Sequence, residues 1–277
     1  MLLGGPVFID SRDPVEIARA HRVSGYRAGY YAGDLSVRDT QGVRAFREAF
    51  EREGVVIAEV PAFGFSLLGD DPDAVRRAIA HVVSKLALAD ELGALCAVNI
   101  VGSYASDGWY APHGRNFSKE AFEASVEVAR RIVDEVKPRR AKMSYEMMSF
   151  NFLDSPRAYL DFLKAVDRSS VGVHMDPVNC ICSPRSYFGF AQILDDCFRL
   201  LGSRIVSCHA KDMTMRAEPV TPQFEEVRPG KGIVDYRQFL SHLRSLPRDV
   251  PLILEHLPNE SEYFAARDFI NGIAKEL

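Results

Sequence analysis

Short apolar runs and amphipathic stretches alternate along the whole chain. Short runs rich in β-branched residues predict strands, and apolar residues spaced three and four apart predict the helices that follow them. Strands are predicted at 2–7, 26–31, 55–60, 96–101, 142–146, 171–176, 204–209 and 252–255. Eight strand–helix units in succession favour a parallel sheet covered by helices.

Residues with capping chemistry mark where the predicted helices begin and end. Asp13 is a predicted N-cap, Thr40 is predicted to cap the second helix, and Gly54 is predicted to end it. Long loops are predicted at 102–117 and 210–232, each directly after a strand. Loops that follow the strands of a parallel barrel gather at one end of it, where active sites lie.

An open doubly wound sheet is the alternative to a closed barrel. That fold would be expected to carry a glycine-rich phosphate turn after its first strand, and the sequence contains neither Gly-x-Gly-x-x-Gly nor a Walker sequence. The length of 277 residues is near the usual size of one barrel, and no linker or low-complexity segment divides it. We therefore predict an α/β protein with a single (β/α)8 TIM barrel of eight parallel strands, forming one domain over residues 1–277.

Composition narrows the range of functions. Hydrophobic residues make up 47% and charged residues 26%, as in ordinary enzymes. The formal net charge of −4 argues against nucleic acid and anionic lipid as partners. No apolar run approaches the roughly 20 residues of a membrane helix, and the start of the chain lacks the pattern of a signal peptide. Five cysteines, with no Cys-x-x-Cys pair, favour a reduced, cytoplasmic protein.

The last four predicted strands each end on a residue that can bind a metal ion. These residues are Glu146, Asp176, His209 and Glu255. Because side chains alternate along a strand, all four are expected to point inward while their apolar neighbours face the helices. Acids at single strand ends are common, but four such groups crowded at one barrel mouth would repel one another without a cation. The pattern therefore predicts a metal site.

Three carboxylates and one imidazole form a hard, oxygen-rich site for one divalent ion. Mn²⁺ fits best, and Mg²⁺, Co²⁺, Fe²⁺ and Zn²⁺ are the alternatives. Four protein ligands leave about two positions of an octahedral ion for adjacent oxygens of a sugar-like polyol. The ion would polarise a carbonyl and stabilise an enediolate, and Glu146 and Glu255 would move the proton as base and acid.

At these residues the chain resembles a known family, the xylose-isomerase-like barrel superfamily. The motifs of that superfamily are similar to five segments of the chain: Glu146, Met175-Asp176-Pro177, His209-Ala210-Lys211-Asp212, Gly230-Lys231-Gly232-Ile233-Val234-Asp235 and Leu254-Glu255-His256. The resemblance covers the last four strands closely and the whole chain loosely. It implies a sugar isomerase or epimerase with one metal ion held by the four residues above. It also implies that the two glutamates are the acid/base pair.

Two positions depart from the 3-epimerase pattern of that superfamily. A histidine often stands three residues after the aspartate of the sixth strand, where this chain has Asn179. An arginine often stands six residues after the histidine of the seventh strand, where this chain has Met215 followed by Arg216. The extra histidines of the related three-zinc endonucleases are largely missing, which argues against a role in DNA repair.

Five further residues are candidates for contact with the substrate. They are Asn179, Lys211, Trp109, Asn116 and Arg228. Lys211 has the parity of His209 and is expected either to contact substrate oxygens or a phosphate, or to pair with Asp212 or Glu226. Trp109 would either stack on a sugar ring or pack within its loop, and Arg228 would either bind an anionic group or remain in solvent.

Several other polar residues have roles that the sequence leaves open. His113, in the loop after the fourth strand, is either a second acid/base catalyst or a solvated side chain. His174 is expected below the metal as a hydrogen-bonded core residue, and His256 has the parity of an outward position. Glu59 ends the third strand and would either face the site or pair with an arginine.

Three functions remain open for a small-molecule, sugar-like substrate. The first is an isomerase or epimerase that transfers protons through a metal-stabilised enediolate. The second is a metal-dependent lyase or hydrolase for a keto-sugar or C-glycoside, with His113 as acid/base. The third is a barrel that binds a sugar without turnover. Whether the chain forms a homo-oligomer is left undecided by the sequence.

Overall fold

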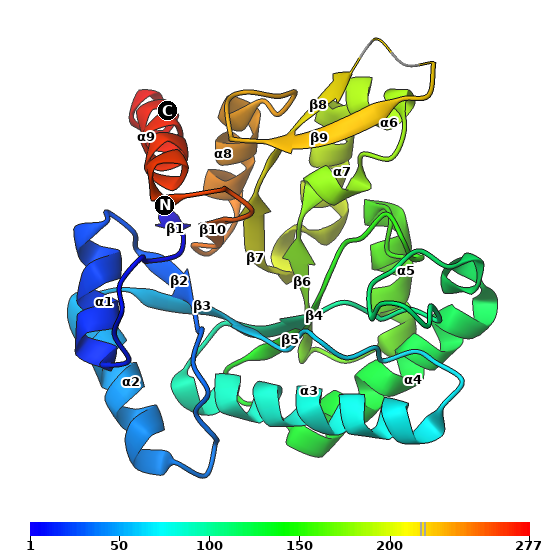
Figure 1. Ribbon diagram of the computed structural model, residues 1–277, viewed down its shortest axis with the longest axis horizontal. Coiled ribbons are helices and arrows are strands. Elements are labelled where there is room, and N and C mark those ends of the chain that lie inside the picture. The colour runs from blue at the N-terminus through cyan, green and yellow to red at the C-terminus, as the bar shows by residue number, and fades with distance from the viewer. Residues whose placement is uncertain (217, 219) are drawn as a thin grey trace.

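The computed structural model of the protein describes residues 1–216, 218 and 220–277. Eight parallel strands close into a barrel in the order β1-β10-β7-β6-β5-β4-β3-β2, which confirms the predicted fold over the open sheet (Figure 1). The barrel strands are β1 (Leu2–Gly4), β2 (Ala28–Tyr30), β3 (Val56–Pro61), β4 (Cys96–Asn99), β5 (Lys142–Glu146), β6 (Val171–Met175), β7 (Ile205–Ala210) and β10 (Pro251–Leu254).

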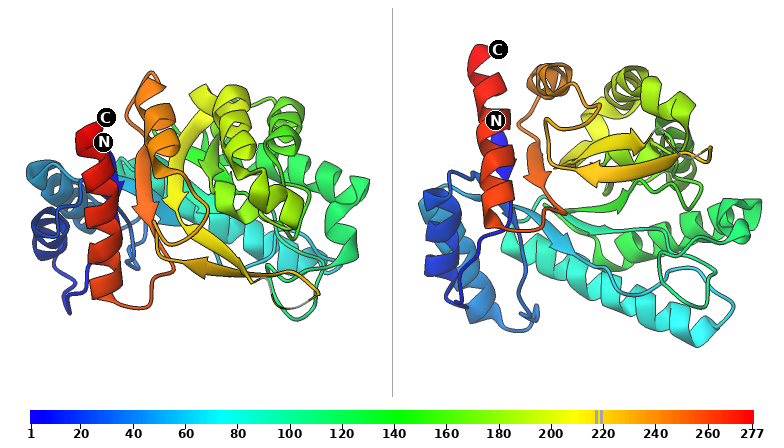
Figure 2. Two further views of the ribbon diagram at one scale, coloured as in Figure 1. Left: turned by 90° about the horizontal axis from the view of Figure 1, so that it is seen from above. Right: turned by 45° about the horizontal axis from the view of Figure 1, so that its top comes forward.

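Helices surround the barrel on its outer side (Figure 2). The α-helices are α1 (Pro14–Val23), α2 (Thr40–Glu53), α3 (Pro72–Leu92), α4 (Lys119–Val136), α5 (Pro156–Val166), α6 (Pro184–Phe188), α7 (Phe190–Leu201), α8 (Tyr236–Ser245) and α9 (Glu260–Glu276). Three short 3-10 helices are η1 (Gly114–Phe117), η2 (Pro177–Cys180) and η3 (Gly202–Arg204). None of the helices in the described residues is long and apolar enough to span a membrane.

Capping chemistry sets most helix ends as predicted. The Asp13 carboxylate accepts a hydrogen bond from the Val15 amide, and Gly54 ends α2 in the left-handed conformation with φ 65°. The predicted N-cap Thr40 is wrong by one residue. Asp39 accepts from the Gly42 amide at 2.9 Å, so Thr40 is the first residue inside the helix. Its neighbour Asp39 presents a carboxylate, at least as good an N-cap acceptor as a threonine hydroxyl.

The segment 210–232, predicted as a loop, contains an antiparallel hairpin. Its strands are β8 (Asp212–Arg216) and β9 (Gln223–Val227), and Figure 1 shows them projecting from the barrel. The pairing joins residues up to 15 positions apart, from Asp212 to Val227. Neither strand contains a run of β-branched residues, so the local pattern gave no signal for them.

The outward and inward faces of the barrel wall carry different kinds of side chain. The outward face packs an apolar cluster against the helices, with Tyr145, Met175, Cys208 and Leu254 fully buried in it. The inward face carries small apolar residues such as Ala28 and also buried polar groups. These polar groups are Glu59, Ser144, His174, Ser207 and His209. All five cysteines are free thiols, and all but Cys182 are buried.

Candidate metal centre

The four predicted ligands converge at the mouth of the barrel. Glu146 is the last residue of β5, Asp176 follows β6, His209 lies in β7 and Glu255 follows β10. Each offers one donor atom, and these atoms all lie within 4.8 Å of one another. The four strands are consecutive neighbours in the barrel, so the side chains form a continuous row along one side of the mouth.

The His209 ring lies at the centre of this row. Its Nδ1 atom is 2.8 Å from Glu255 Oε1, 3.3 Å from Glu146 Oε1 and 3.7 Å from Asp176 Oδ2. Its opposite nitrogen, Nε2, points down into the barrel, 3.4 Å from Glu59 Oε2. The two ring nitrogens therefore have separate surroundings, and Nδ1 is the one that faces the carboxylates.

Lys211 joins the cluster and pairs with three carboxylates, of which Glu226 was an expected partner. Its Nζ atom is 2.6 Å from Glu255 Oε1, 2.9 Å from Asp176 Oδ2 and 3.8 Å from Glu226 Oε1. The side chain is almost entirely buried, with 3% of its surface exposed. Its strongest ion pairs are thus made with the candidate ligands, and the Asp212 carboxylate is used elsewhere.

The acidic and basic groups of the cluster each stabilise the charged form of the other. Burial alone would raise the pKa of Asp176 and of Glu255, but Lys211 and His209 hold both pKa values below their usual range. Burial would lower the pKa of His209 and of Lys211, but the surrounding carboxylates raise both well above their usual values. Asp176 and Glu255 are therefore held in the ionised form that binds cations.

The residues fit a divalent cation on two counts. Asp176 Oδ2 and Glu255 Oε1 are buried carboxylate oxygens that accept no hydrogen bond and face only the charges of Lys211 and His209, so a cation could share them. If an ion takes the place of the His209 Nδ1 proton, the carboxylates of Glu146, Asp176 and Glu255 together with the Lys211 ammonium would leave two negative charges, which one divalent ion would neutralise. A site with three oxygen donors and one nitrogen donor suits Mn²⁺ or Mg²⁺ better than a structural zinc ion.

Asn179 reaches the cluster from the first turn after Asp176. Its side-chain amide donates to Glu146 Oε1 at 3.3 Å and to the Met147 carbonyl at 3.0 Å, and its Oδ1 accepts from Lys211 at 3.3 Å. It therefore links a candidate ligand to the buried ammonium. His256 lies outside the row, where its Nδ1 is 2.8 Å from Glu226 Oε2, as its parity predicted.

The loop after β4 contains two candidates for substrate contact, Asn116 and Trp109, and neither is among the four clustered ligands. Asn116 is buried, and its amide binds Ser103, the Ala111 carbonyl and the Phe150 carbonyl, so it ties loops together instead of facing the cluster. The predicted substrate contact at Asn116 is therefore not supported by its position. Trp109 packs on Phe63, with ring centroids 5.5 Å apart, at the loop that follows β3.

His113 has a structural partner within its own loop, and Arg228 has one on helix α9. His113 is exposed and caps η1 by accepting from the Arg115 amide at 3.2 Å. Arg228 Nε is 2.8 Å from Glu262 Oε2, so its charge is paired and it is not a free arginine in solvent. Neither position brings the side chain into the row of four candidate ligands described by the structure.

A carboxylate-centred network under the cluster was only partly anticipated. Glu59 Oε1 lies 3.0 Å from His174 Nε2 and accepts a short hydrogen bond from the Ser207 hydroxyl, while Glu59 Oε2 faces His209. Of the two alternatives for Glu59, the structure shows the inward position, where its partners are two histidines and a serine and not an arginine. His174 is a buried, hydrogen-bonded residue one layer down, as its parity predicted.

Asp212 organises the glycine-containing loop that leads to α8. Its carboxylate accepts backbone hydrogen bonds from Met213, Gly230, Gly232 and Val234 at 2.9–3.0 Å. A Cβ atom at Gly232 would lie 2.3 Å from Asp212 Oδ1, so only glycine allows this approach. Tyr236 adds a 2.7 Å hydrogen bond to the Lys211 carbonyl, which anchors the segment beside the cluster.

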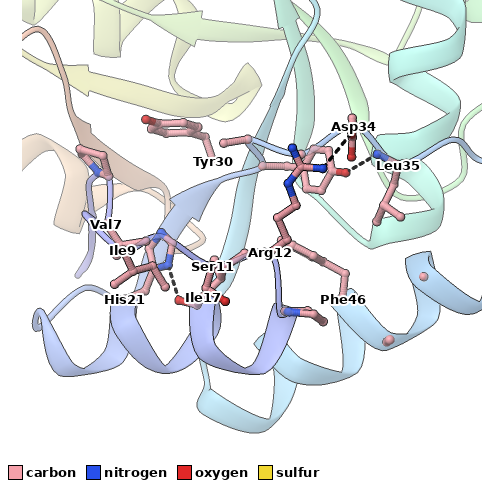
Figure 3. Close-up of a pocket in the computed structure, with 17 residues that line it drawn as sticks. Val7, Ile9, Ser11, Arg12, Ile17, His21, Tyr30, Asp34, Leu35 and Phe46 are labelled. Carbon is pink, nitrogen blue, oxygen red and sulfur yellow. Dashed lines mark hydrogen bonds and ion pairs between the residues drawn. The ribbon is translucent and has the colours of Figure 1, made fainter.

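A cavity of about 670 Å³ lies between the loops after β1 and β2 and the helices α1 and α2 (Figure 3). Its lining is largely apolar, including Val7, Ile17 and Phe46. None of the four candidate ligands lines it. However, β1 pairs with β10, and Gly4 stands opposite Ile253, two residues before Glu255. The cavity is therefore on the Glu255 side of the mouth, and Tyr30 at the end of β2 forms part of its wall.

The chain matches one sequence family over most of its length. The family described as "Xylose isomerase-like TIM barrel" matches residues 15–273. No curated protein matches the chain.

Several solved structures share the fold at low sequence identity. D-psicose 3-epimerase with D-tagatose from Clostridium cellulolyticum H10 is similar with a TM-score of 0.72 and 16% identity, over 99% of each chain. The apo form of 3-keto-D-glucoside 4-epimerase from E. coli gives a TM-score of 0.68 and 12% identity, over 98% of this chain and 99% of that one. A xylose isomerase-like TIM barrel protein from Mycobacterium smegmatis in complex with magnesium gives 0.67 and 18%, over 95% and 89%. At these identities the likeness concerns the fold.

Proposed function

Because the chain belongs to the xylose isomerase-like TIM barrel family, we propose that it is a divalent-metal-dependent sugar isomerase or epimerase. Glu146, Asp176, His209 and Glu255 would hold the ion, which supplies Lewis-acid polarisation of a substrate carbonyl when bound. Mn²⁺ is the ion we expect first, and the magnesium complex of a structural neighbour is in line with a hard divalent ion.

The observation that carries this proposal is the position of the two glutamates. Glu146 on β5 and Glu255 after β10 lie at opposite ends of the row, with Asp176 and His209 between them. A substrate bound over the row would have one carboxylate on each side of it. One glutamate would remove the proton from the carbon beside the carbonyl, and the other would return a proton to the resulting enediolate.

The remaining residues of the cluster would position and select the substrate. Lys211 and Asn179 would donate hydrogen bonds to substrate oxygens, and Trp109 would cover one face of the sugar ring. The charges of Lys211 and Arg228 are both paired with carboxylates. We therefore propose a neutral sugar or keto-sugar instead of a sugar phosphate, since no unpaired arginine or lysine of the described cluster is left for a phosphate.

Exchange of substrate hydrogen with solvent tests the proposed reaction. Ketoses, keto-inositols and 3-keto-glycosides would be incubated with the Mn²⁺-loaded protein in deuterium oxide. We expect deuterium at the carbon next to the carbonyl of a substrate that is turned over. Turnover of a sugar without any deuterium incorporation would contradict proton transfer through the enediolate.

Glutamine substitutions test the two glutamates separately. Glu146→Gln and Glu255→Gln should each lower kcat by at least about 100-fold, because each removes one proton-transfer group. Glu135→Gln, on the exposed side of α4, is the matched control and should keep the wild-type rate. Wild-type rates in either cluster variant would exclude that glutamate from the reaction.

The cavity favours a second candidate, a lyase or hydrolase for a glycoside. A largely apolar space of about 670 Å³ on the Glu255 side could receive an aglycone, for which a free ketose has no use. His113 would then serve as acid/base only if its loop moved toward the cluster. A product of lower mass from a 3-keto-glycoside, together with a strong loss of rate in His113→Ala, would favour this function over epimerisation. Binding of sugars with no turnover under any metal ion would instead favour a binding protein.

A further inference from the structure

Glu59 is a carboxylate enclosed inside the barrel, below the row of candidate ligands. Only 2% of its surface is exposed, and its neighbours His174 and Ser207 are fully buried. A buried carboxylate is strongly unfavourable unless donors surround it. Glu59 has three: the Ser207 hydroxyl, His174 Nε2 at 3.0 Å and His209 Nε2 at 3.4 Å.

We propose that Glu59 is a positioning residue that fixes the tautomer and orientation of His209, so that His209 presents an unprotonated Nδ1 to the metal ion. The inference rests on the metal-binding part of the proposed function. A neutral imidazole has one N–H donor and one acceptor nitrogen. Because the Glu59 carboxylate accepts only, its contact holds a proton on Nε2 and directs Nδ1 toward Glu146, Asp176 and Glu255, where a bound ion would take the place of the Nδ1 proton.

His174 contacts the same carboxylate of Glu59. The His174 and His209 rings are nearly perpendicular, at 79°, with centroids 4.1 Å apart. Their Nε2 atoms lie 3.1 Å from each other, and each contacts Glu59. Two N–H groups that converge on one carboxylate hold the rings against rotation, since turning either ring would leave a buried donor unpaired.

The same three residues have the composition of a small metal site, which is the competing interpretation. Glu59, His174 and His209 each place a donor atom within 4.8 Å of the others. For a second ion to bind there while His209 also serves the upper site, His209 would have to bind ions through both nitrogens. Binding through both nitrogens requires that neither carries a proton, whereas a neutral imidazole keeps a proton on one of them. The two interpretations therefore differ in the number of ions bound per chain.

Metal binding measured without any substrate tests the inference. Titration of the metal-free protein with Mn²⁺ in a calorimeter should give one ion per wild-type chain. Glu59→Gln keeps the shape of the side chain but removes its charge, and the affinity for Mn²⁺ should fall about 10- to 100-fold. Ser207→Ala removes a donor to Glu59 without touching His209, and its affinity should fall less than threefold. Glu225→Gln, on the exposed hairpin, should match the wild type.

Nitrogen-15 NMR of the histidine rings provides a readout that needs no variant at Glu59. In the Mg²⁺-loaded wild type, His209 should show a proton on Nε2 and none on Nδ1. A proton on Nδ1, two ions bound per chain, or an unchanged affinity in a folded Glu59→Gln variant would each overturn the inference. Failure of the protein to turn over any sugar would overturn the proposed reaction but leave these metal-binding results intact, so the two failures can be told apart.

Discussion

Lys211 carries a full positive charge in a place where few lysines lie. Its ammonium is enclosed by carboxylates of Asp176, Glu255 and Glu226, which raise its pKa well above the usual value against the effect of burial. This charge keeps a dense group of acids compatible with a folded barrel. At the same time it repels a cation placed among the same acids. The residue thus has opposite effects on folding without metal and on metal binding.

Replacing Lys211 with methionine should separate these two effects. We expect Lys211→Met to lose about 3 kcal/mol of stability without metal, because it leaves buried carboxylates unpaired. Addition of Mn²⁺ should raise its melting temperature more than that of the wild type, because the competing charge is gone. Thermal unfolding with and without Mn²⁺ measures both the loss of stability and the metal-induced shift in melting temperature. Lys164→Met, on the exposed side of α5, is the control. An equal metal-induced shift in both proteins would contradict this account of Lys211.

Asp212 acts within its own loop, and its loss should be local. Asp212→Ala removes the acceptor for four backbone amides, so we expect a loss of about 1–3 kcal/mol in unfolding free energy. Urea unfolding measures the total effect. Hydrogen exchange should become faster at Gly230, Gly232 and Val234, while Asp249→Ala, at an exposed loop position, should change neither quantity. Unchanged exchange at those three amides would contradict the anchoring role.

At the scale of the element, predictions succeeded where the pattern was local. Strand parity placed Glu146, Asp176, His209 and Glu255 on the inward face because alternation is a property of each strand by itself. The partners of Glu59 could not be predicted in this way. His174 and His209 lie 115 and 150 positions away, and barrel closure alone brings them to β3. The β8–β9 hairpin was missed for the same reason, because its pairing depends on contact and not on propensity.

Helix α3 is joined to the start of β5 through one carboxylate, which allows a test by pH. Asp90 accepts backbone hydrogen bonds from Arg140 at 2.6 Å and Ala141 at 2.9 Å. Burial raises the pKa of Asp90, but these hydrogen bonds outweigh it and lower the pKa below the usual value. The stabilisation is therefore present above the unfolded pKa and is lost as the pH falls through the lower, folded pKa.

Asp90→Ala should accordingly be less stable than the wild type by about 1–2 kcal/mol at pH 7. The difference should narrow as the pH falls below about 4, because protonation removes the same hydrogen-bond acceptor from the wild type. Denaturant unfolding at a series of pH values measures the difference. A gap that stays constant into acid would show that the loss in the variant comes from packing and not from the carboxylate.

For the whole molecule, the candidate metal centre joins four separate strand–helix units. Its ligands come from β5, β6, β7 and β10, which are neighbours in the barrel although 109 positions separate Glu146 from Glu255. The site for this ion exists only in the folded chain. The free energy of binding the ion therefore adds to the free energy of unfolding. The barrel as a whole should then respond to metal as a cooperative unit.

Mn²⁺ at about 100 times its Kd should therefore raise the unfolding free energy by about 2.7 kcal/mol. A chelator should reverse the increase in melting temperature. Asp176→Asn, which removes one charged ligand from the centre, should show little or no response to the same Mn²⁺ concentration. Equal responses in this variant and the wild type would mean that the ion stabilises the protein from another place.

All four candidate ligands come from the second half of the chain, from residue 146 onward, whereas β1 to β4 contribute the cavity wall, the loop with Trp109 and the single carboxylate of Glu59. This division of the chain has a consequence for how members of the family can diverge in sequence. On the proposed function, mutations in the first half are expected to alter which molecule is accepted without disturbing the ion, provided that Glu59 is kept. If the proposed function holds, hybrids that join the first half of one relative to the second half of another would be a route to new specificity, and such exchanges should keep Glu59, which contacts His209.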